Sequence, residues 1–240
     1  MNSRQPKRTD FAGERTGPSR MPLRRHLTPR RLPGAPVHVD IVTMSGFDAA
    51  YRRIPPWDIG RPQREIVRLE EEGGLHGSVL DCGCGTGENA LYLANRGHEV
   101  WGVDSSPNAI RKAQSKAGER AIAAKFLVVD ALDLRGLGQT FDTVIDCGLF
   151  HVFSDADRER YVSSLATVTA PGAKLFLLCF SDLEPGDMGP RRVRREEIRQ
   201  AFVKGWRVQD IRASTLERNI EGKPAKAWLS EIVRIALTRT

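Results

Sequence analysis

Three alternate glycines, Gly83, Gly85 and Gly87, follow an apolar stretch at residues 78–82 and precede a helical pattern. Glycine lets the chain turn tightly and brings backbone N–H groups close to a ligand, and the N-terminus of a helix favours an anionic group. The alternative is a tight strand-to-helix turn that binds nothing. The spacing predicts a binding loop, and the acidic residues that follow it support this interpretation.

Two acidic residues follow the next two apolar stretches. Asp104 stands 21 residues after Gly83, where a carboxylate can accept hydrogen bonds from both hydroxyls of a ribose. Asp130 ends the following stretch, and Ala131 beside it offers an apolar contact for an adenine ring whose amine would bind the acid. A dinucleotide loop requires a third glycine at position 88, which is Glu88, so the sequence predicts a ligand other than a pyrophosphate.

The elements that must hold these residues alternate along the chain. Helical patterns separate short apolar stretches at residues 78–82, 98–103, 126–129, 141–145 and 173–180. This alternation predicts one α/β domain with a doubly wound, Rossmann-like, mostly parallel sheet and helices on both faces. Ligands of such sheets bind beyond the carboxyl ends of the strands, where Asp104, Asp130 and Asp146 fall.

Four segments in order resemble a known family. Residues 79–89 (VLDCGCGTGEN), 100–104 (VWGVD), 126–131 (FLVVDA) and 141–147 (FDTVIDC) are similar to the motifs of class I S-adenosylmethionine-dependent methyltransferases. The resemblance implies S-adenosylmethionine as the cofactor and a seven-stranded sheet with an antiparallel last strand. Apolar stretches at residues 206–213 and 228–237 fit the closing antiparallel pair of such a sheet.

The resemblance also implies which residues bind the cofactor. The backbone of the three glycines would hold its amino-acid end, Asp104 its ribose, and Asp130 with Ala131 its adenine. Two further motif residues are assigned to the same site, Asp81 and Cys147.

Residues 51–62 (YRRIPPWDIGRP) resemble small-molecule methyltransferases, which include thiopurine and thiol S-methyltransferases and bacterial enzymes acting on phenolic or heterocyclic compounds. By this analogy Trp57 would close over the cofactor, and the alternative is that Trp57 anchors the core. The expected acceptor is therefore an O, N or S atom of a small aromatic or heterocyclic molecule.

His151 follows the fourth strand, where the acceptor would approach the cofactor in this architecture. Methyl transfer from a sulfonium is an in-line displacement, so proximity and orientation supply most of the acceleration. A neutral histidine is a candidate general base, and the alternative is a histidine that only binds the backbone or shapes the pocket. Residues 182–190 are a candidate lid. The residues expected to line the acceptor pocket are Trp57, Phe150, Phe153 and Met188.

Two sets of side chains suggest a metal site, and both have too few ligands. Asp146 and Asp182 end neighbouring strands, but Leu183 follows where catechol-type magnesium enzymes have an asparagine. Cys82 and Cys84 lack a second Cys/His pair. We therefore expect no metal and assign both cysteines to packing.

The basic charge of the chain is concentrated at its start. The 240 residues carry a net charge of +7, but residues 1–40 hold nine Lys/Arg against three acids, which leaves +1 for the rest. Six prolines in the same stretch predict a disordered, basic, Pro/Arg-rich tail over residues 1–43, followed by the methyltransferase domain over residues 44–240. Met44 is the expected natural start of translation.

Composition also indicates the compartment of the protein and the class of molecule on which it acts. Four scattered cysteines, no long apolar run and no signal peptide predict a cytoplasmic protein without a membrane segment. The runner-up function is methylation of RNA or DNA with help from the basic tail. Residues 146–149 (DCGL) differ from the Asn/Asp-Pro-Pro-aromatic motif of amino-methylating nucleic-acid enzymes, which disfavours that function. A cofactor-binding regulator without activity is the third alternative.

Overall fold

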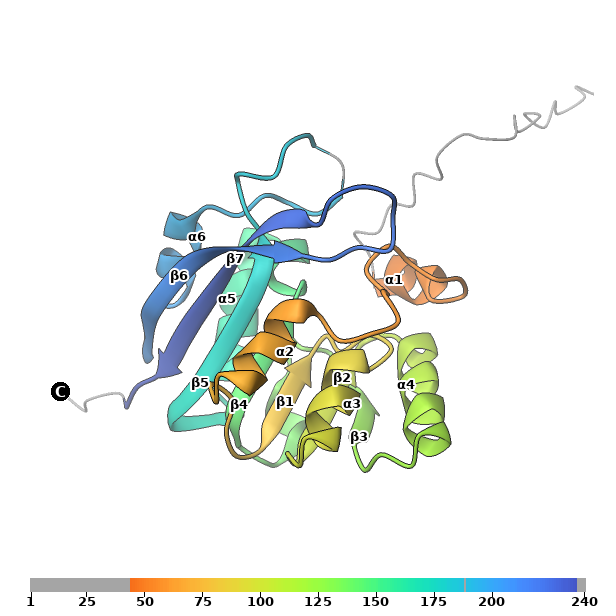
Figure 1. The fold of residues 1–240 in the computed structure, drawn as a ribbon. Helices are drawn as coiled ribbons and strands as arrows, with labels where there is room; N and C mark the ends of the chain where they lie inside the picture. Colours follow the sequence, from red (N-terminus) through yellow and green to blue (C-terminus); the bar gives the residue numbers. More distant parts are fainter. Residues whose placement is uncertain (1–43, 188, 237–240) are drawn as a thin grey trace, which may run out of the picture. The chain divides into compact units, whose positions relative to one another are not determined.

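The computed structural model describes residues 44–187 and 189–236 (Figure 1). The predicted tail at residues 1–43 and the pocket residue Met188 lie outside the described residues. The helices are α1 (Met44–Ala50), α2 (Arg64–Glu71), α3 (Glu88–Asn95), α4 (Pro107–Glu119), α5 (Asp155–Leu165) and α6 (Arg195–Ala201), with 3-10 turns η1 (Leu134–Leu137) and η2 (Phe150–Val152). The strands are β1 (Val79–Cys82), β2 (Val100–Asp104), β3 (Lys125–Val128), β4 (Phe141–Cys147), β5 (Thr169–Phe180), β6 (Trp206–Leu216) and β7 (Ala225–Arg234).

The strands form one seven-stranded sheet in the order β3-β2-β1-β4-β5-β7-β6. β1 pairs in parallel with β2 and with β4, so the glycine loop that follows β1 lies at the centre of the parallel part. β7 is antiparallel to both β5 and β6, and it lies between them. The predicted α/β fold with a mostly parallel sheet and a closing antiparallel pair is therefore confirmed.

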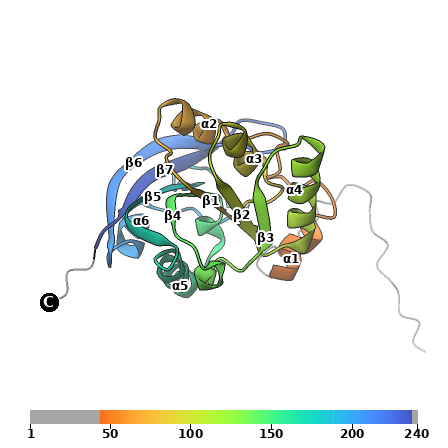
Figure 2. The same ribbon diagram turned by 90° about the horizontal axis from the view of Figure 1, so that it is seen from below.

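Helices cover both faces of the sheet (Figure 2). One apolar core joins α2, α3 and α4 to the sheet, and a second joins η1, α5 and α6 to the opposite face. Along β5 successive side chains alternate between the two cores: Leu175, Leu177 and Cys179 enter one, and Phe176, Leu178 and Phe180 enter the other. This alternation is why β5 is apolar without interruption.

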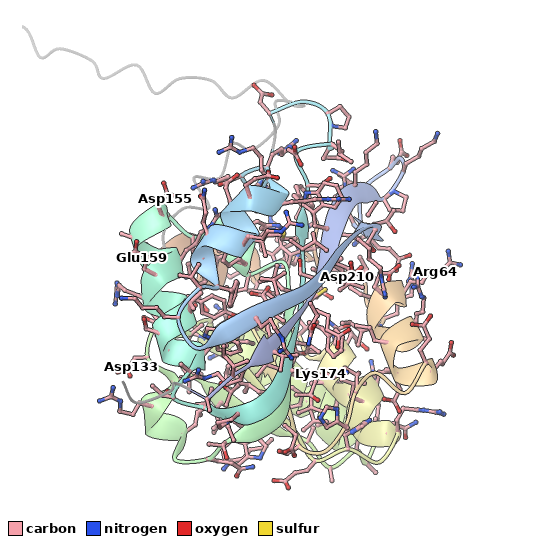
Figure 3. All side chains as sticks on the ribbon, turned by 90° about the vertical axis from the view of Figure 1, so that its left-hand side faces the viewer. Arg64, Asp133, Asp155, Glu159, Lys174 and Asp210 are labelled. Carbon is pink, nitrogen blue, oxygen red and sulfur yellow. The ribbon has the colours of Figure 1, made fainter. Side chains whose placement is uncertain are left out.

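Local sequence signals explain where the helices begin. Ser106 accepts a hydrogen bond from the Ala109 N–H, and Pro107 occupies the first turn of α4. Ser154 caps α5 in the same way through the Asp157 N–H. Figure 3 shows Asp155 and Glu159 on α5, both exposed, so the helix turns its charged side to solvent.

No helix within residues 44–187 and 189–236 is long and apolar enough to cross a membrane.

Candidate functional site

The three glycines of the loop after β1 all adopt a left-handed backbone, with φ of +75° at Gly83, +54° at Gly85 and +83° at Gly87. A Cβ at Gly87 would lie 2.8 Å from the Phe126 ring, and one at Gly85 would lie 2.7 Å from the Tyr51 hydroxyl. The Gly83 N–H donates to the Val103 carbonyl at 2.8 Å, which ties the loop to β2. Both the backbone conformation and the close neighbours require glycine here.

Asp104 holds the glycine loop from the end of β2. Its Oδ2 accepts the Gly85 N–H at 2.9 Å, and its Oδ1 accepts the Ser106 N–H at 2.8 Å. Burial raises the pKa of Asp104, and these two N–H donors partly offset that effect. Each carboxylate oxygen has a second lone pair, so the residue can still accept hydrogen bonds from a ligand.

Asp81 is a buried carboxyl whose oxygens make no hydrogen bond of normal geometry with the described residues. It lies on β1 between Gly102 of β2 and Ile145 of β4, and it is 1% exposed. Burial raises its pKa to about 8, although the Ala90 N–H acts in the opposite direction. An orphaned buried carboxyl is costly, and a cationic ligand atom would relieve that cost.

Asp130 and Ala131 follow β3 at the same edge of the sheet. The Asp130 Oδ1 accepts the Leu132 N–H at 2.9 Å, which shapes the turn, and Ala131 is buried in one of the two cores. Cys147 ends β4, pairs with Leu178 of β5 and is half-buried. The predicted site residues on β1 to β4 thus come from the carboxyl ends of adjacent parallel strands.

The segment after α1 packs over the glycine loop. The Trp57 Nε1–H donates to the Tyr51 hydroxyl at 2.8 Å, and the Trp57 ring meets the Phe47 ring edge-on, with centroids 5.7 Å apart. Tyr51 is buried against Gly85, whereas Trp57 is half-buried. Trp57 therefore anchors local packing against Tyr51 and Phe47, and its closure over the cofactor stays a prediction.

Two polar clusters that the sequence analysis did not identify fasten the segment at residues 44–63. Asp48 of α1 accepts hydrogen bonds from the Ser106 hydroxyl at 2.7 Å and from the Asn108 N–H at 3.0 Å. The Thr86 hydroxyl donates to Asp58 at 3.1 Å. These contacts join residues about 30 to 60 positions apart, so no local spacing signals them.

His151 is buried in η2, beyond the end of β4. Its Nδ1 accepts the Phe180 N–H at 2.9 Å, and the Phe180 ring packs edge-on with its centroid 4.8 Å away. Burial, assisted by the positive charges of Arg158 and Arg192, lowers the pKa of His151 to about 3. The imidazole is therefore neutral at physiological pH.

The carboxylate of Asp146, near the end of β4, is fully engaged in hydrogen bonds with the turn that follows the strand and with α5. It accepts hydrogen bonds from the Leu149 N–H at 2.8 Å, the Phe150 N–H at 3.1 Å and the Tyr161 hydroxyl at 2.9 Å. Burial raises its pKa to about 6. Asp182 accepts the Trp228 Nε1–H at 3.1 Å. The described residues contain no group of three or more His, Cys, Asp or Glu that could hold a metal ion.

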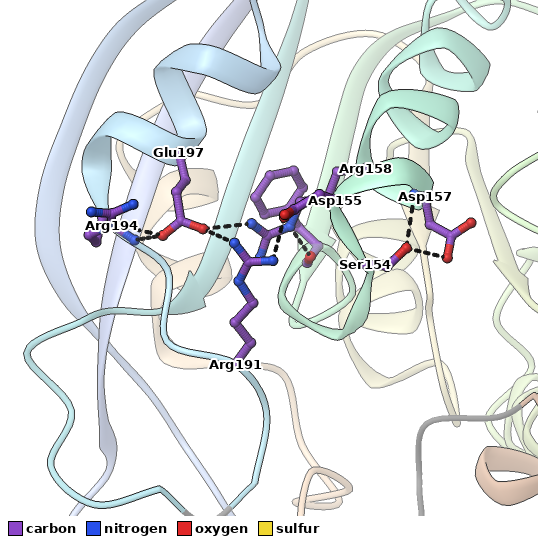
Figure 4. A network of polar contacts seen from close by, with 8 residues as sticks. Ser154, Asp155, Asp157, Arg158, Arg191, Arg194 and Glu197 are labelled. Atoms are coloured by element: carbon purple, nitrogen blue, oxygen red, sulfur yellow. Dashed lines mark hydrogen bonds and ion pairs between the residues drawn. The ribbon is translucent and has the colours of Figure 1, made fainter.

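An ion-pair network joins α5 to α6 and to the segment before it (Figure 4). Glu197 accepts from the buried Arg158 at 3.1 Å, from the Arg194 N–H at 2.9 Å and from Arg191. Arg158 also donates to the Phe150 carbonyl at 3.3 Å, within the turn that carries His151. Arg191 and Arg192 thus hold the end of the candidate lid at residues 182–190.

Comparison with known proteins gives a consistent result. Residues 79–172 match the family model described as "Methyltransferase domain". The chain is 43% identical over 171 residues to the 2-heptyl-1-hydroxyquinolin-4(1H)-one methyltransferase of Mycobacteroides abscessus, covering 70% of this chain and 75% of that protein. It is 28% identical over 151 residues to the probable thiol methyltransferase 2 of Arabidopsis thaliana, covering 62% of this chain and 66% of that protein.

Solved structures share the fold. The structure reported as "Conversion of a Disulfide Bond into a Thioacetal Group during Echinomycin Biosynthesis" is 38% identical, with a TM-score of 0.75 over 80% of this chain and 93% of that one. Magnesium protoporphyrin IX methyltransferase from Synechocystis PCC 6803, solved with bound S-adenosylmethionine, is 24% identical, with a TM-score of 0.56 over 71% of this chain and 76% of that one.

Proposed function

We propose, because this chain belongs to the class I S-adenosylmethionine-dependent methyltransferases of the small-molecule type, that it methylates an oxygen, nitrogen or sulfur atom of a small aromatic or heterocyclic molecule. The observation that carries this proposal is the 43% identity to an enzyme named for a hydroxyquinolone, itself an aromatic heterocycle. The aromatic residues near the carboxyl edge of the sheet, among them Trp57 and Phe180, suit such an acceptor.

The cofactor's amino-acid end belongs at the glycine loop in this proposal. A side chain at Gly83, Gly85 or Gly87 would be strained. Because glycine has no side chain, the backbone of the loop can approach the cofactor closely. The unpartnered Asp81 carboxyl is suited to the ammonium group, which would turn a buried orphan into an ion pair. Cys147, the last residue of β4, is assigned to the same site.

The nucleoside end belongs at β2 and β3. Asp104 has lone pairs available for the ribose hydroxyls while its present bonds keep its carboxylate fixed. Asp130 is suited to the adenine amine, and the buried Ala131 to the ring. Trp57, held by the Tyr51 hydroxyl, would close over the cofactor from the side of α1.

The acceptor belongs beside His151. When bound, S-adenosylmethionine supplies a methyl group activated by a sulfonium. The chain's own contribution is to hold the acceptor atom in line with that methyl group and to exclude water, which converts an encounter in solution into a reaction between fixed neighbours. His151, held by the Phe180 N–H, is the candidate residue for contact with the acceptor.

The remaining proposals concern partners, location and domain organisation. A nearly neutral body beyond residue 40 favours a small molecule over a nucleic acid as the acceptor. We place the protein in the cytoplasm, since its cysteines are free in the structure and suit a reducing compartment. Residues 44–240 form the methyltransferase domain, and residues 1–43 are a basic tail.

Methyl transfer from radiolabelled S-adenosylmethionine to a panel of phenols, aromatic thiols, N-heterocycles and RNA tests the proposal. We expect label in one of the three small-molecule classes and none in RNA. Label in RNA alone would contradict the proposed acceptor class. Tight cofactor binding without transfer to any acceptor would instead support a regulator without activity.

A further inference from the structure

We infer that His151 acts as a hydrogen-bond donor to the acceptor through its Nε2–H, so that the acceptor atom enters the site already deprotonated. This inference rests on the proposed function, and it deepens that function by naming the acceptor class. It differs from the role of general base that the position of His151 first suggests.

The tautomer of His151 follows from one hydrogen bond. A backbone N–H can only donate, so the Nδ1 atom that receives the Phe180 N–H at 2.9 Å must be the unprotonated nitrogen. A neutral imidazole carries its one proton on the other nitrogen, which places it on Nε2. The lone pair that a general base needs is therefore already used by the backbone of β5.

The Nε2 edge of the imidazole lies beside Gly148, which has no side chain to cover it. Nε2 makes no hydrogen bond with the described residues, and it lies 3.5 Å from the place where a Cβ on Gly148 would be. Gly148, with φ of +93°, directly follows β4. Nε2–H is thus a donor at the strand end beyond which ligands of such sheets bind.

The charged surroundings oppose a second proton on His151. Arg158 of α5 and Arg192 of the segment before α6 both act on it with positive charge, and both lower its pKa. Two acids of this region are engaged elsewhere: Glu197 binds Arg158, and Asp146 accepts hydrogen bonds from the turn and from Tyr161. The same positive charges favour an anionic acceptor.

Methyl transfer in this arrangement requires no general base on the protein. The acceptor loses its proton to solvent before it binds, and the Nε2–H of His151 donates to the resulting anion. A lone pair of the acceptor forms the new bond to the methyl carbon, the carbon–sulfur bond breaks, and its electron pair remains on sulfur. No proton moves in the transfer step. Suitable acceptors ionise near neutral pH, as aromatic thiols, acidic phenols and N-hydroxy heterocycles do.

The tautomer can be observed without turnover. Nitrogen NMR of the full chain carrying isotope-labelled histidine distinguishes the two tautomers, and the His151 signal is assigned by its loss in a variant. We expect an Nε2–H imidazole that does not titrate between about pH 5 and 8, because its pKa lies near 3. An Nδ1–H signal, or titration near neutral pH, would overturn the donor role.

Two variants distinguish the hydrogen bond that the His151 Nε2–H donates to the acceptor from the one that Nδ1 accepts from the Phe180 N–H. In His151→Asn the amide oxygen can still accept the Phe180 N–H, but no donor remains at the Nε2 position; in His151→Gln the amide NH₂ can occupy that position. We expect Asn to lower kcat by about 10- to 150-fold, the effect of losing a hydrogen bond to a charged group, and Gln to retain most of the activity. Equal activity of the Asn variant and the native protein would contradict the inference. The exposed His76→Asn is the control.

A series of aromatic thiols with different thiol pKa values provides the third measurement. If the acceptor must be ionised, the rise of kcat/KM with pH has a midpoint that follows the pKa of each thiol. A midpoint that is the same for every thiol would identify a base on the enzyme and overturn the inference alone. Absence of transfer to any acceptor would instead overturn the proposed function.

Discussion

Buried ionisable side chains at the carboxyl edge of the sheet differ in how the protein satisfies them. The Nδ1 atom of His151 accepts a backbone N–H, and Asp146 accepts two backbone N–H groups and the Tyr161 hydroxyl. Asp81 is buried to the same degree and has no such donor of normal geometry among the described residues. A buried carboxyl without a partner is best explained by a ligand that is its partner.

Asp81→Asn tests this explanation through pH. The carboxyl has a pKa of about 8 in the free protein, and an ammonium beside it favours the charged form, so cofactor binding must release a proton. We expect the affinity for S-adenosylmethionine to rise as the pH increases towards about 8, by up to about tenfold per unit, and to be weaker and nearly independent of pH in Asp81→Asn. Calorimetric titration in buffers of different ionisation enthalpy measures both effects.

The stability of the cofactor-free protein has the opposite pH dependence. The folded-state pKa of Asp81 lies above its ordinary value of 3.8, so the folded state binds the extra proton. Its contribution to the free energy of unfolding therefore falls as pH rises from about 4 to about 8, and Asp81→Asn should remove that part of the decline. The exposed Asp210→Asn is the control. An identical slope in Asp81→Asn and the native protein would contradict the raised pKa.

Two glycines separate backbone strain from crowding. Gly87 and Gly138 both have a left-handed φ, but a Cβ at Gly87 would lie 2.8 Å from Phe126, whereas nothing lies within 4 Å of a Cβ at Gly138. We expect Gly138→Ala to lower the free energy of unfolding by about 1–2 kcal/mol from conformation alone, and Gly87→Ala to lower it by more, about 2–5 kcal/mol in total. Urea denaturation measures the difference, and equal losses would contradict a tightly packed loop.

At the scale of elements, the site is completed by segments outside the parallel strands. Helix α1 is fastened to the start of α4 through Asp48, and helix α6 is fastened to α5 through Glu197. The segment that follows α1 borders the glycine loop. Arg158, the partner of Glu197, donates to the Phe150 carbonyl in the turn that carries His151. Each of these two connections therefore joins one half of the proposed site to a helix on the sheet.

Glu197→Gln tests the second connection. Glu197 is 12% exposed and faces Arg158, which is 5% exposed, so loss of its charge leaves a buried guanidinium unpaired. We expect the free energy of unfolding to fall by about 3–5 kcal/mol. The neighbouring Glu196, 67% exposed and paired with Arg199 at 3.8 Å, is the matched control, and Glu196→Gln should cost about 0–1 kcal/mol.

The stability that the Glu197 ion pairs contribute should also depend on pH. Although burial opposes it, the hydrogen bonds and charges of Arg191 and Arg194 lower the pKa of Glu197 to about 2. Its contribution is then complete above the ordinary carboxyl pKa of 4.5 and is lost as pH falls towards 2. Melting temperatures of the native protein and Glu197→Gln should converge over that range, and a constant difference would count against the ion pairs.

At the scale of the whole molecule, the patterns that are local in sequence predicted the structure well. The alternation of apolar stretches and helices predicted the sheet and its two covered faces. A strand that is buried on both faces is apolar along its length, so its own residues indicate its position. Strand limits were less accurate. The apolar stretch at residues 228–237 predicted a strand that begins later than β7, which starts at Ala225, since pairing with β6 extends it into less apolar sequence.

The features that decide the chemistry of the site depend on distant contacts and could not be predicted. The tautomer of His151 is set by Phe180, 29 residues away, and Tyr51 reaches Gly85 from another element. Likewise, no spacing shows that Asp81 lacks a partner or that Glu197 gathers three arginines. Residue types indicated where the site is, whereas its protonation states required the structure.

The most direct test of the account is a competition in one reaction. The full chain is mixed with S-adenosylmethionine carrying a deuterated methyl group, together with 2-heptyl-1-hydroxyquinolin-4(1H)-one, an aromatic thiol and transfer RNA, and each product is analysed by mass spectrometry. We expect the label to enter a small aromatic acceptor and to be absent from the RNA. Label in the RNA, with both small molecules unmodified, would contradict this expectation.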